Sequence, residues 1–157
     1  MKNFIECINL AQKHFKTADH LTYVTYSLIN EPKLLLTVVQ NLQKATYYTM
    51  EAIISFEQYN KNILTIPSDF ESRFQILKKD CAKKYEIDSK LLNIIWELNN
   101  LTSFRQNSSM EFVRQNKYVL CDKDYSKIEM IDIGKIKNYL INIRILLKKL
   151  ERVKKNV

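Results

Sequence analysis

The side chains best suited to bind a ligand or take part in a reaction lie in one stretch, residues 103–121, with the sequence SFRQNSSMEFVRQNKYVLC. It carries Arg105, Asn107, Arg114 and Lys117. Guanidinium and ammonium groups bind phosphate oxygens, and an amide can donate a further hydrogen bond. The stretch contains no histidine, so proton transfer near neutral pH lacks its commonest side chain. These residue types predict a site that binds an anion, and they do not predict catalysis.

Cationic side chains are also concentrated in residues 135–157, which hold eight basic residues and one acidic residue. The net charge of the chain is +8, so almost all of the excess lies in this segment. A basic patch of this kind predicts an anionic partner such as RNA, although an AT-rich genome also encodes many lysines whatever the function. Ile141 and Ile145 fall inside the basic arc, where a partner, a second copy or a neighbouring helix could cover them. The arc comprises Lys137, Arg144, Lys148, Lys149, Arg152 and Lys155.

Several kinds of chemistry lack their residues in this chain. One glycine excludes Gly-rich phosphate loops, and no HExxH or Cys/His cluster is present. The two histidines, His14 and His20, are six residues apart, which is a rotation of about 240° around one helix (about 120° by the shorter way), so they cannot chelate one metal ion. The three cysteines are widely spaced and fit small apolar side chains in a reducing compartment. We therefore expect no cofactor, no metal and no catalytic residue.

The composition is that of a helical domain. At 157 residues the chain is most simply one domain, residues 1–157, and one Gly with two Pro leaves little material for tight turns. The start of the chain does not have the pattern of a signal peptide, and no apolar run is long enough to cross a membrane. We therefore expect a cytoplasmic protein without a membrane segment.

The apolar spacing predicts five helices in an all-α, up-and-down bundle, with a small hairpin-like insertion before the last helix. The first helix covers residues 3–29, and its apolar face drifts to Leu21, Val24 and Leu28. The second, most apolar helix should be central. Ser68 or Asp69, Asp88 or Ser89, and Asp132 are the expected N-caps of the later helices. The predicted helices are residues 3–29, 32–60, 69–85, 89–105 and 133–155, with a polar loop at 122–132.

Residues around the hairpin receive specific predictions. The short β-rich runs 111–113 and 117–120 flank Gln115-Asn116, where Asn can adopt the positive φ of a tight turn. Arg105 falls on the buried stripe of the fourth helix, at its C-terminal end, so we expect its guanidinium to point into the bundle or a cleft. Trp96 lies away from that stripe and should pack against another helix or a second subunit.

The layout of long first helix, central helix LLLTVVQNLQKATYYTMEAIISFE, two shorter helices and a final helix resembles the HEPN superfamily of nucleotide-binding helical bundles. The segment SSMEFVRQNKYVLC is similar to one in small uncharacterised archaeal HEPN-like proteins. The resemblance covers most of the chain in layout but only about 15–20 residues in motif. It implies the fold and a homodimer.

Ribonucleases of that superfamily carry an Arg, four to six residues and then a His, which converge across a dimer cleft on the RNA 2′-hydroxyl and phosphate. Arg105 matches the family Arg by position, but Met110, Glu111 and Phe112 stand where the His would be. Asn107 lies near the position where the related archaeal sequences place their histidine. An amide cannot exchange a proton near neutral pH, so the resemblance argues against nuclease activity.

Three hypotheses follow. The first is a non-catalytic, dimeric HEPN-like bundle that binds RNA or another anionic partner through the basic last helix and the segment from Arg105 to Arg114. The second is a protein-interaction or antitoxin-like subunit that pairs with a nucleotidyltransferase or a similar partner. The third and weakest is a degenerate ribonuclease that uses Arg105, Asn107 and Glu111.

Overall fold

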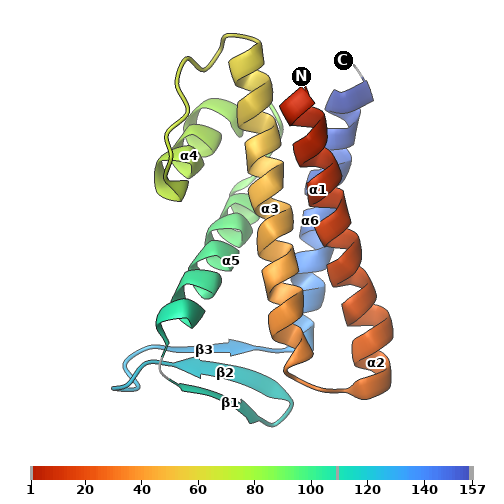
Figure 1. The fold of residues 1–157 in the computed structure, drawn as a ribbon, viewed down its shortest axis with the longest axis vertical. Helices are drawn as coiled ribbons and strands as arrows, with labels where there is room; N and C mark the ends of the chain where they lie inside the picture. Colours follow the sequence, from red (N-terminus) through yellow and green to blue (C-terminus); the bar gives the residue numbers. More distant parts are fainter. Residues whose placement is uncertain (1, 109, 156–157) are drawn as a thin grey trace.

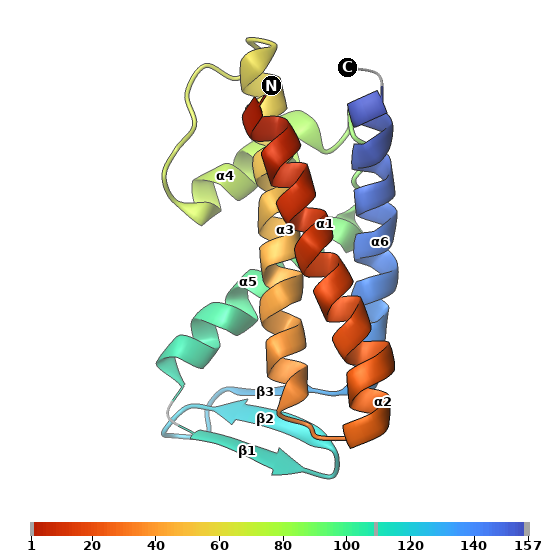
Figure 2. The same cartoon turned by 45° about the vertical axis from the view of Figure 1, so that its right-hand side comes forward.

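Three long helices form the body of the molecule in the computed structural model, which describes residues 2–108 and 110–155 (Figure 1). They are α1 (Lys2–His20), α3 (Leu34–Tyr59) and α6 (Ile133–Lys155). Both lengthwise views show them side by side (Figures 1 and 2). α3 contacts α1, α6 and both helices described next, which confirms that the most apolar helix is central.

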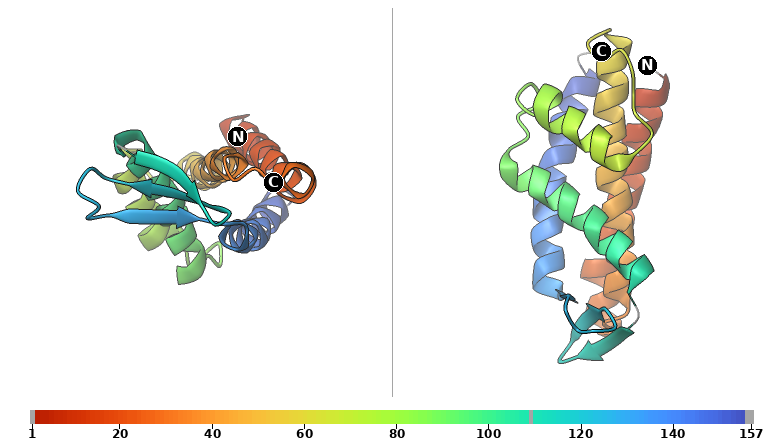
Figure 3. Two further views of the ribbon diagram at one scale, coloured as in Figure 1. Left: turned by 90° about the horizontal axis from the view of Figure 1, so that it is seen from below. Right: turned by 90° about the vertical axis from the view of Figure 1, so that its left-hand side faces the viewer.

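Two helices cross the remaining flank of α3 (Figure 3, right). The first is α4 (Phe70–Ile76), continued by a π-helical turn, η2 (Leu77–Cys81), and the second is α5 (Ser89–Asn107). Asp69 and Asp88 cap them as predicted: each carboxylate accepts a backbone N–H, from Ser72 at 2.8 Å and from Leu91 at 2.9 Å. The predicted C-terminal end of the third helix, residue 85, is wrong, because residues 82–86 form turns.

The all-α prediction needs one correction, because the insertion is a three-stranded antiparallel sheet in the order β1-β2-β3. The strands are β1 (Met110–Arg114), β2 (Lys117–Cys121) and β3 (Ile128–Ile131). The predicted hairpin is confirmed, with Gln115 and Asn116 both at positive φ, 50° and 60°. β3 lies inside the residues predicted to be polar loop, and it pairs with β2.

The sheet closes the end of the helical body opposite the two chain ends (Figure 3, left). Tyr118, Leu120 and Ile131 of its inner face belong to the hydrophobic core. Phe112, Ile128 and Met130 lie on the other face and are exposed. Val119 and Cys121, on that same face of the central strand, are buried, so the exposed apolar side chains of this face come from β1 and β3.

Two apolar clusters fill the body, one near the sheet and one near the chain ends. The predicted buried stripes are confirmed for α5 and for α6. Asp132 caps α6, as predicted, and accepts the Lys135 backbone N–H at 2.8 Å. The stripe residues are Leu91, Ile94, Ile95, Leu98 and Leu101 in α5, and Ile136, Leu140, Ile143, Leu147 and Leu150 in α6.

The first helix departs from its predicted face near its end. A π-helical turn, η1 (Leu21–Thr25), separates α1 from the short α2 (Tyr26–Ile29). The wider turn shifts the register, so Thr22 and Tyr26 are buried while Val24 and Leu28 are exposed. The prediction that Val24 and Leu28 continue the apolar face is therefore wrong.

Candidate functional site

Arg105 reaches a pocket of about 270 Å³ where α3, the end of α5 and the sheet meet. Its side chain is 35% exposed, and it lines the pocket beside Gln40, Thr102 and Glu111. The floor is apolar and is made by Leu36, Val39, Leu101, Leu120 and Ile131. The guanidinium thus faces a cleft between elements, at the position that the helical spacing indicated.

The guanidinium of Arg105 already has an anionic partner within the chain. Its Nε donates to Oε1 of Glu111 at 3.2 Å, and the Tyr118 hydroxyl donates to Oε2 of the same carboxylate at 2.6 Å. Burial, together with the hydrogen bond to Glu111 and its negative charge, raises the pKa of Tyr118 to about 12. Tyr118 is therefore a neutral hydrogen-bond donor at neutral pH, and Glu111 balances the charge of Arg105.

The other predicted residues of this region lie apart from that pair. Asn107 is exposed, and its amide donates to the Ser103 backbone carbonyl at 3.0 Å. Arg114 and Lys117 face each other across the hairpin, next to its turn. Lys117 Nζ lies 3.9 Å from Oδ2 of Asp132, the cap of α6. The structure therefore brings Arg105 and Glu111 together but leaves Asn107 outside the cluster.

The basic face of α6, which we define as Lys137, Arg144, Lys148, Arg152 and Lys155, is exposed along the helix. Lys137 Nζ lies 5.5 Å from the Tyr23 ring centroid. Arg144 donates to Asp19 at 2.8 Å and lies over the Phe15 ring. Lys148, Arg152 and Lys155 form no ion pair with any residue in 2–108 or 110–155. Three of the five cations are thus open to solvent ions or to a partner.

Two apolar side chains lie within this basic face. Ile141 is 54% exposed and Ile145 is 45% exposed, as expected if the helix packs only through its main stripe. No neighbouring helix in the described chain covers them. Branched apolar side chains among cations are a feature of surfaces that contact another macromolecule.

The two predicted binding regions are separate surfaces. The Arg105 pocket is lined by α3, α5 and the sheet, whereas the basic face of α6 runs beside α1 along a groove that includes Gln12, Phe15 and Lys16. Lys117 lies near the start of α6, because its ammonium group is 3.9 Å from Asp132, the N-cap of that helix.

Sequence reasoning did not identify Tyr118 as the partner of Glu111, or Gln40 as part of the pocket. The contact between Tyr118 and Glu111 could have been predicted from the hairpin register. A two-residue turn at Gln115-Asn116 pairs 113 with 118 and 111 with 120, so residues 111 and 118 are diagonal neighbours on one face. No comparable signal pointed to Gln40, because its position depends on how α3 meets the sheet.

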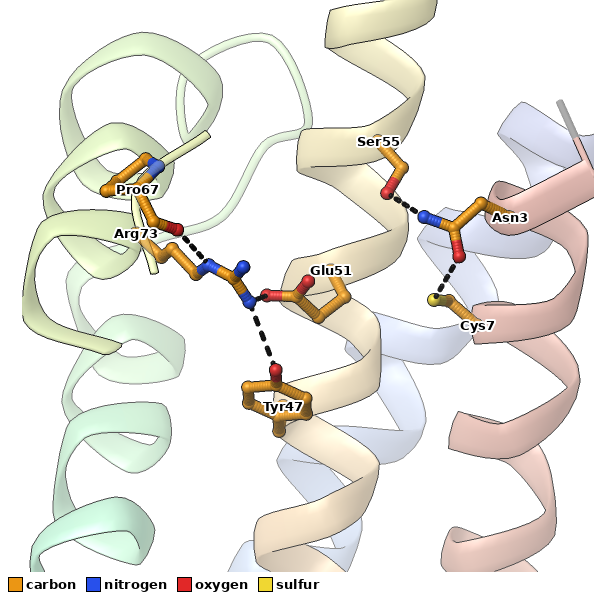
Figure 4. A network of polar contacts seen from close by, with 7 residues as sticks. All are labelled: Asn3, Cys7, Tyr47, Glu51, Ser55, Pro67 and Arg73. Carbon is orange, nitrogen blue, oxygen red and sulfur yellow. Dashed lines mark hydrogen bonds and ion pairs between the residues drawn. The ribbon is translucent and has the colours of Figure 1, made fainter. Parts of the chain in front are cut away.

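Arg73 joins α4 to α3 through its guanidinium (Figure 4). Its Nη1 donates to Glu51 at 2.7 Å and to the Tyr47 hydroxyl at 3.1 Å, while its Nε donates to the Pro67 carbonyl at 2.6 Å. Burial raises the pKa of Glu51, and the charge of Arg73 opposes that shift. On the other side of α3, Figure 4 shows Asn3 donating to Ser55 at 2.9 Å. These contacts join α4 to α3 and α1 to α3.

A second carboxylate of α3, Glu57, also bonds within the fold. It is 4% exposed and accepts hydrogen bonds from Tyr85 at 2.5 Å, Lys84 at 2.7 Å and Asn62 at 2.7 Å. These donors lower its pKa although burial acts in the opposite direction. Glu57 therefore anchors the segments on either side of α4 as a charged group.

Comparison with protein-family models, with curated proteins and with solved structures finds no match for this chain. In the part of the chain that the structure describes, no three His, Cys, Asp or Glu side chains converge as a metal site requires. Within the same residues, every helix is too short or too polar to cross a membrane.

Proposed function

We propose that this chain is a non-catalytic, HEPN-like up-and-down helical bundle that acts as a homodimer and binds RNA, or another anionic polymer, through the basic face of α6. The observation that carries the proposal is the charge of that exposed face. Five cations follow one side of the helix over 19 residues, and the one acidic residue of the segment, Glu151, is held by Gln12 at 2.7 Å.

Such a face suits a polyanion for an electrostatic reason. Lysine and arginine that neutralise phosphates release condensed counterions, which gives affinity without sequence preference and a steep dependence on salt. Two copies of the same face would place like charges opposite each other, so this surface fits an anionic partner better than it fits a second copy. The homodimer of the proposal would therefore use another surface.

RNA binding is tested by fluorescence anisotropy with a labelled single-stranded RNA over a salt series. Lys137→Ala, Lys148→Ala and Arg152→Ala together should weaken binding at least about tenfold at low salt and make the salt slope shallower by about 2. The matched control replaces Lys79, Lys83 and Lys90, which are exposed on other elements. Equal losses in the two triple variants, or no binding by the wild type at low salt, would contradict the proposal.

The homodimer has its own measurement, light scattering at micromolar concentration. A molar mass of twice the single chain is expected. A measured mass equal to one chain would contradict the homodimer but would leave the proposal of RNA binding unaffected.

Catalysis is left out of the proposal because Arg105 is paired with Glu111 and Asn107 is turned back onto its own helix. Ribonuclease assays of the wild type beside Arg105→Ala address the point. We expect equal background activity in both proteins. A loss of cleavage in the variant would support the degenerate ribonuclease.

The exposed Ile141 and Ile145 favour a second candidate, a protein partner with an acidic and apolar surface, such as a nucleotidyltransferase. Co-expression with the product of a neighbouring gene tests it. Wild type should co-purify with that product, and Ile141→Ser with Ile145→Ser should not, while RNA binding by the two proteins stays similar. Retention of the partner by the double variant would count against this candidate.

A further inference from the structure

A second pocket, of about 310 Å³, lies between α4–η2 and the first half of α5, on the flank seen in Figure 3, right. This volume is at the lower end of the roughly 300–1,000 Å³ that ligand pockets occupy. The pocket shares no lining residue with the Arg105 pocket or with the groove beside α6. It is lined by Phe74, Gln75, Lys78, Ser89, Leu92, Asn93 and Trp96.

Aromatic rings and one leucine make the floor of this pocket. Phe74 and Leu92 are buried, and Trp96 is half-buried. The Trp96 ring centroid lies 5.0 Å from that of Phe74 and 5.9 Å from that of Phe70, so the indole is held in place by both rings. A fixed indole that is still partly accessible can stack a planar ligand at a small cost in side-chain entropy.

The rim of the pocket is polar and has no internal partners. Gln75, Lys78, Ser89 and Asn93 come from three elements, and none of their side chains forms a hydrogen bond or ion pair with residues 2–108 or 110–155. In the Arg105 pocket, by contrast, Arg105, Glu111 and Tyr118 satisfy one another. The rim at Trp96 therefore offers one cation, two amides and one hydroxyl to a ligand.

We propose that the Trp96 pocket binds a planar heteroaromatic ring that carries an anionic group. The ring would stack on the indole, the amides of Gln75 and Asn93 would form hydrogen bonds with ring nitrogens or an exocyclic amine, and Lys78 would bind the anion. A nucleoside monophosphate and a heteroaromatic carboxylate both have this chemistry. The site is independent of the basic face of α6, so it stands or fails apart from the proposed function.

Trp96 is the only tryptophan in the chain, so its fluorescence reports on this pocket alone. The full chain is titrated with AMP and, separately, with nicotinate. Adenosine supplies the ring without the anion, and inorganic phosphate supplies the anion without the ring. We expect a saturable change with AMP, with nicotinate or with both, a weaker response to adenosine and none to phosphate. Saturation by AMP alone would identify the nucleotide as the source, and saturation by nicotinate alone the carboxylate.

Two variants decide whether the ligand occupies this pocket. Lys78→Ala should weaken binding roughly tenfold, since it removes one charge-assisted hydrogen bond. Lys79→Ala is the matched control, because Lys79 is the next exposed lysine and does not line the pocket. Asn93→Ala should also weaken binding. No saturable response to AMP or nicotinate at millimolar concentration, or equal affinities of the Lys78 and Lys79 variants, would overturn the proposal.

Discussion

The Arg105 pocket and the Trp96 pocket are similar in size but opposite in their polar groups. In the first, the guanidinium, the carboxylate and the phenol bond to one another, so a ligand would have to break contacts before making its own. In the second, the polar rim has no partner in the described chain, and an aromatic floor lies beneath it. An arginine that lines a pocket therefore does not by itself make a vacant site.

Trp96→Ala should have the largest effect, because it removes the indole from Phe70 and Phe74. We expect the free energy of unfolding to fall by about 3 kcal/mol, the low end for a large aromatic, since Trp96 is half-buried. Urea unfolding measures it, with Trp96→Phe as the milder control. If Trp96→Ala lost less unfolding free energy than the control, the indole would not contribute to packing. The pocket floor could then not be called rigid.

Glu111→Gln should come second, with a loss of about 1–2 kcal/mol, because it weakens the bonds to Arg105 and Tyr118 together. Glu129→Gln is the matched control, since Glu129 is on the same sheet and has no ion pair among the described residues. Thermal and urea unfolding of both variants compare the losses. If the two variants were equally stable, the Arg105 pocket would not be internally satisfied, and its contrast with the Trp96 pocket would fail.

The pH dependence of that difference tests the same contacts. The pKa of Tyr118 is raised from an ordinary 10.0 to about 12, so the stability it contributes is fully present below pH 10 and is lost as the pH rises through 12. Glu111→Gln removes part of the shift while burial keeps the rest. The wild type should therefore exceed the variant by a constant amount from neutral pH to pH 10, and by less above it. A gap that stays constant at pH 11 would contradict the bond to Glu111.

The smallest effect is expected from Lys78→Ala with Asn93→Ala. Both side chains are exposed and have no partner among the described residues, so the change in unfolding free energy should stay within about 0.5 kcal/mol. The measurement is the same urea titration. A loss of more than about 1 kcal/mol would show that these residues stabilise the fold, and the rim would no longer count as unengaged.

Much of the fold was predictable from local chemistry. Helix faces followed from apolar spacing, caps from Asp69, Asp88 and Asp132, and the hairpin from the turn at Gln115-Asn116. The four residues of β3 were not predictable, because their strand conformation depends on backbone pairing with β2 and not on their local sequence. The predicted apolar face of the first helix is wrong from η1 onward, because a π-helical turn adds one residue and shifts the helical register.

The candidate sites were predictable only where one element decides the geometry. Arg105 lies on a helical stripe and the α6 cations lie on one helix, so their directions followed from spacing. The Trp96 pocket depends on how α4 and α5 cross, which packing against α3 decides. Sequence spacing assigned Trp96 to a contact with another helix or subunit, and the structure shows the helix contact, with Phe70 and Phe74.

The strand β1 has a consequence for self-association. Among residues 2–108 and 110–155 it pairs with β2 alone, so the backbone groups of its outer edge have no strand partner there and could template another chain. Its apolar pair, Phe112 and Val113, is exposed between Glu111 and Arg114. An inward-pointing charge on an edge strand opposes the addition of a further strand. Besides its bond to Arg105, the charge of Glu111 therefore opposes the pairing of a strand from another chain with the open edge of β1.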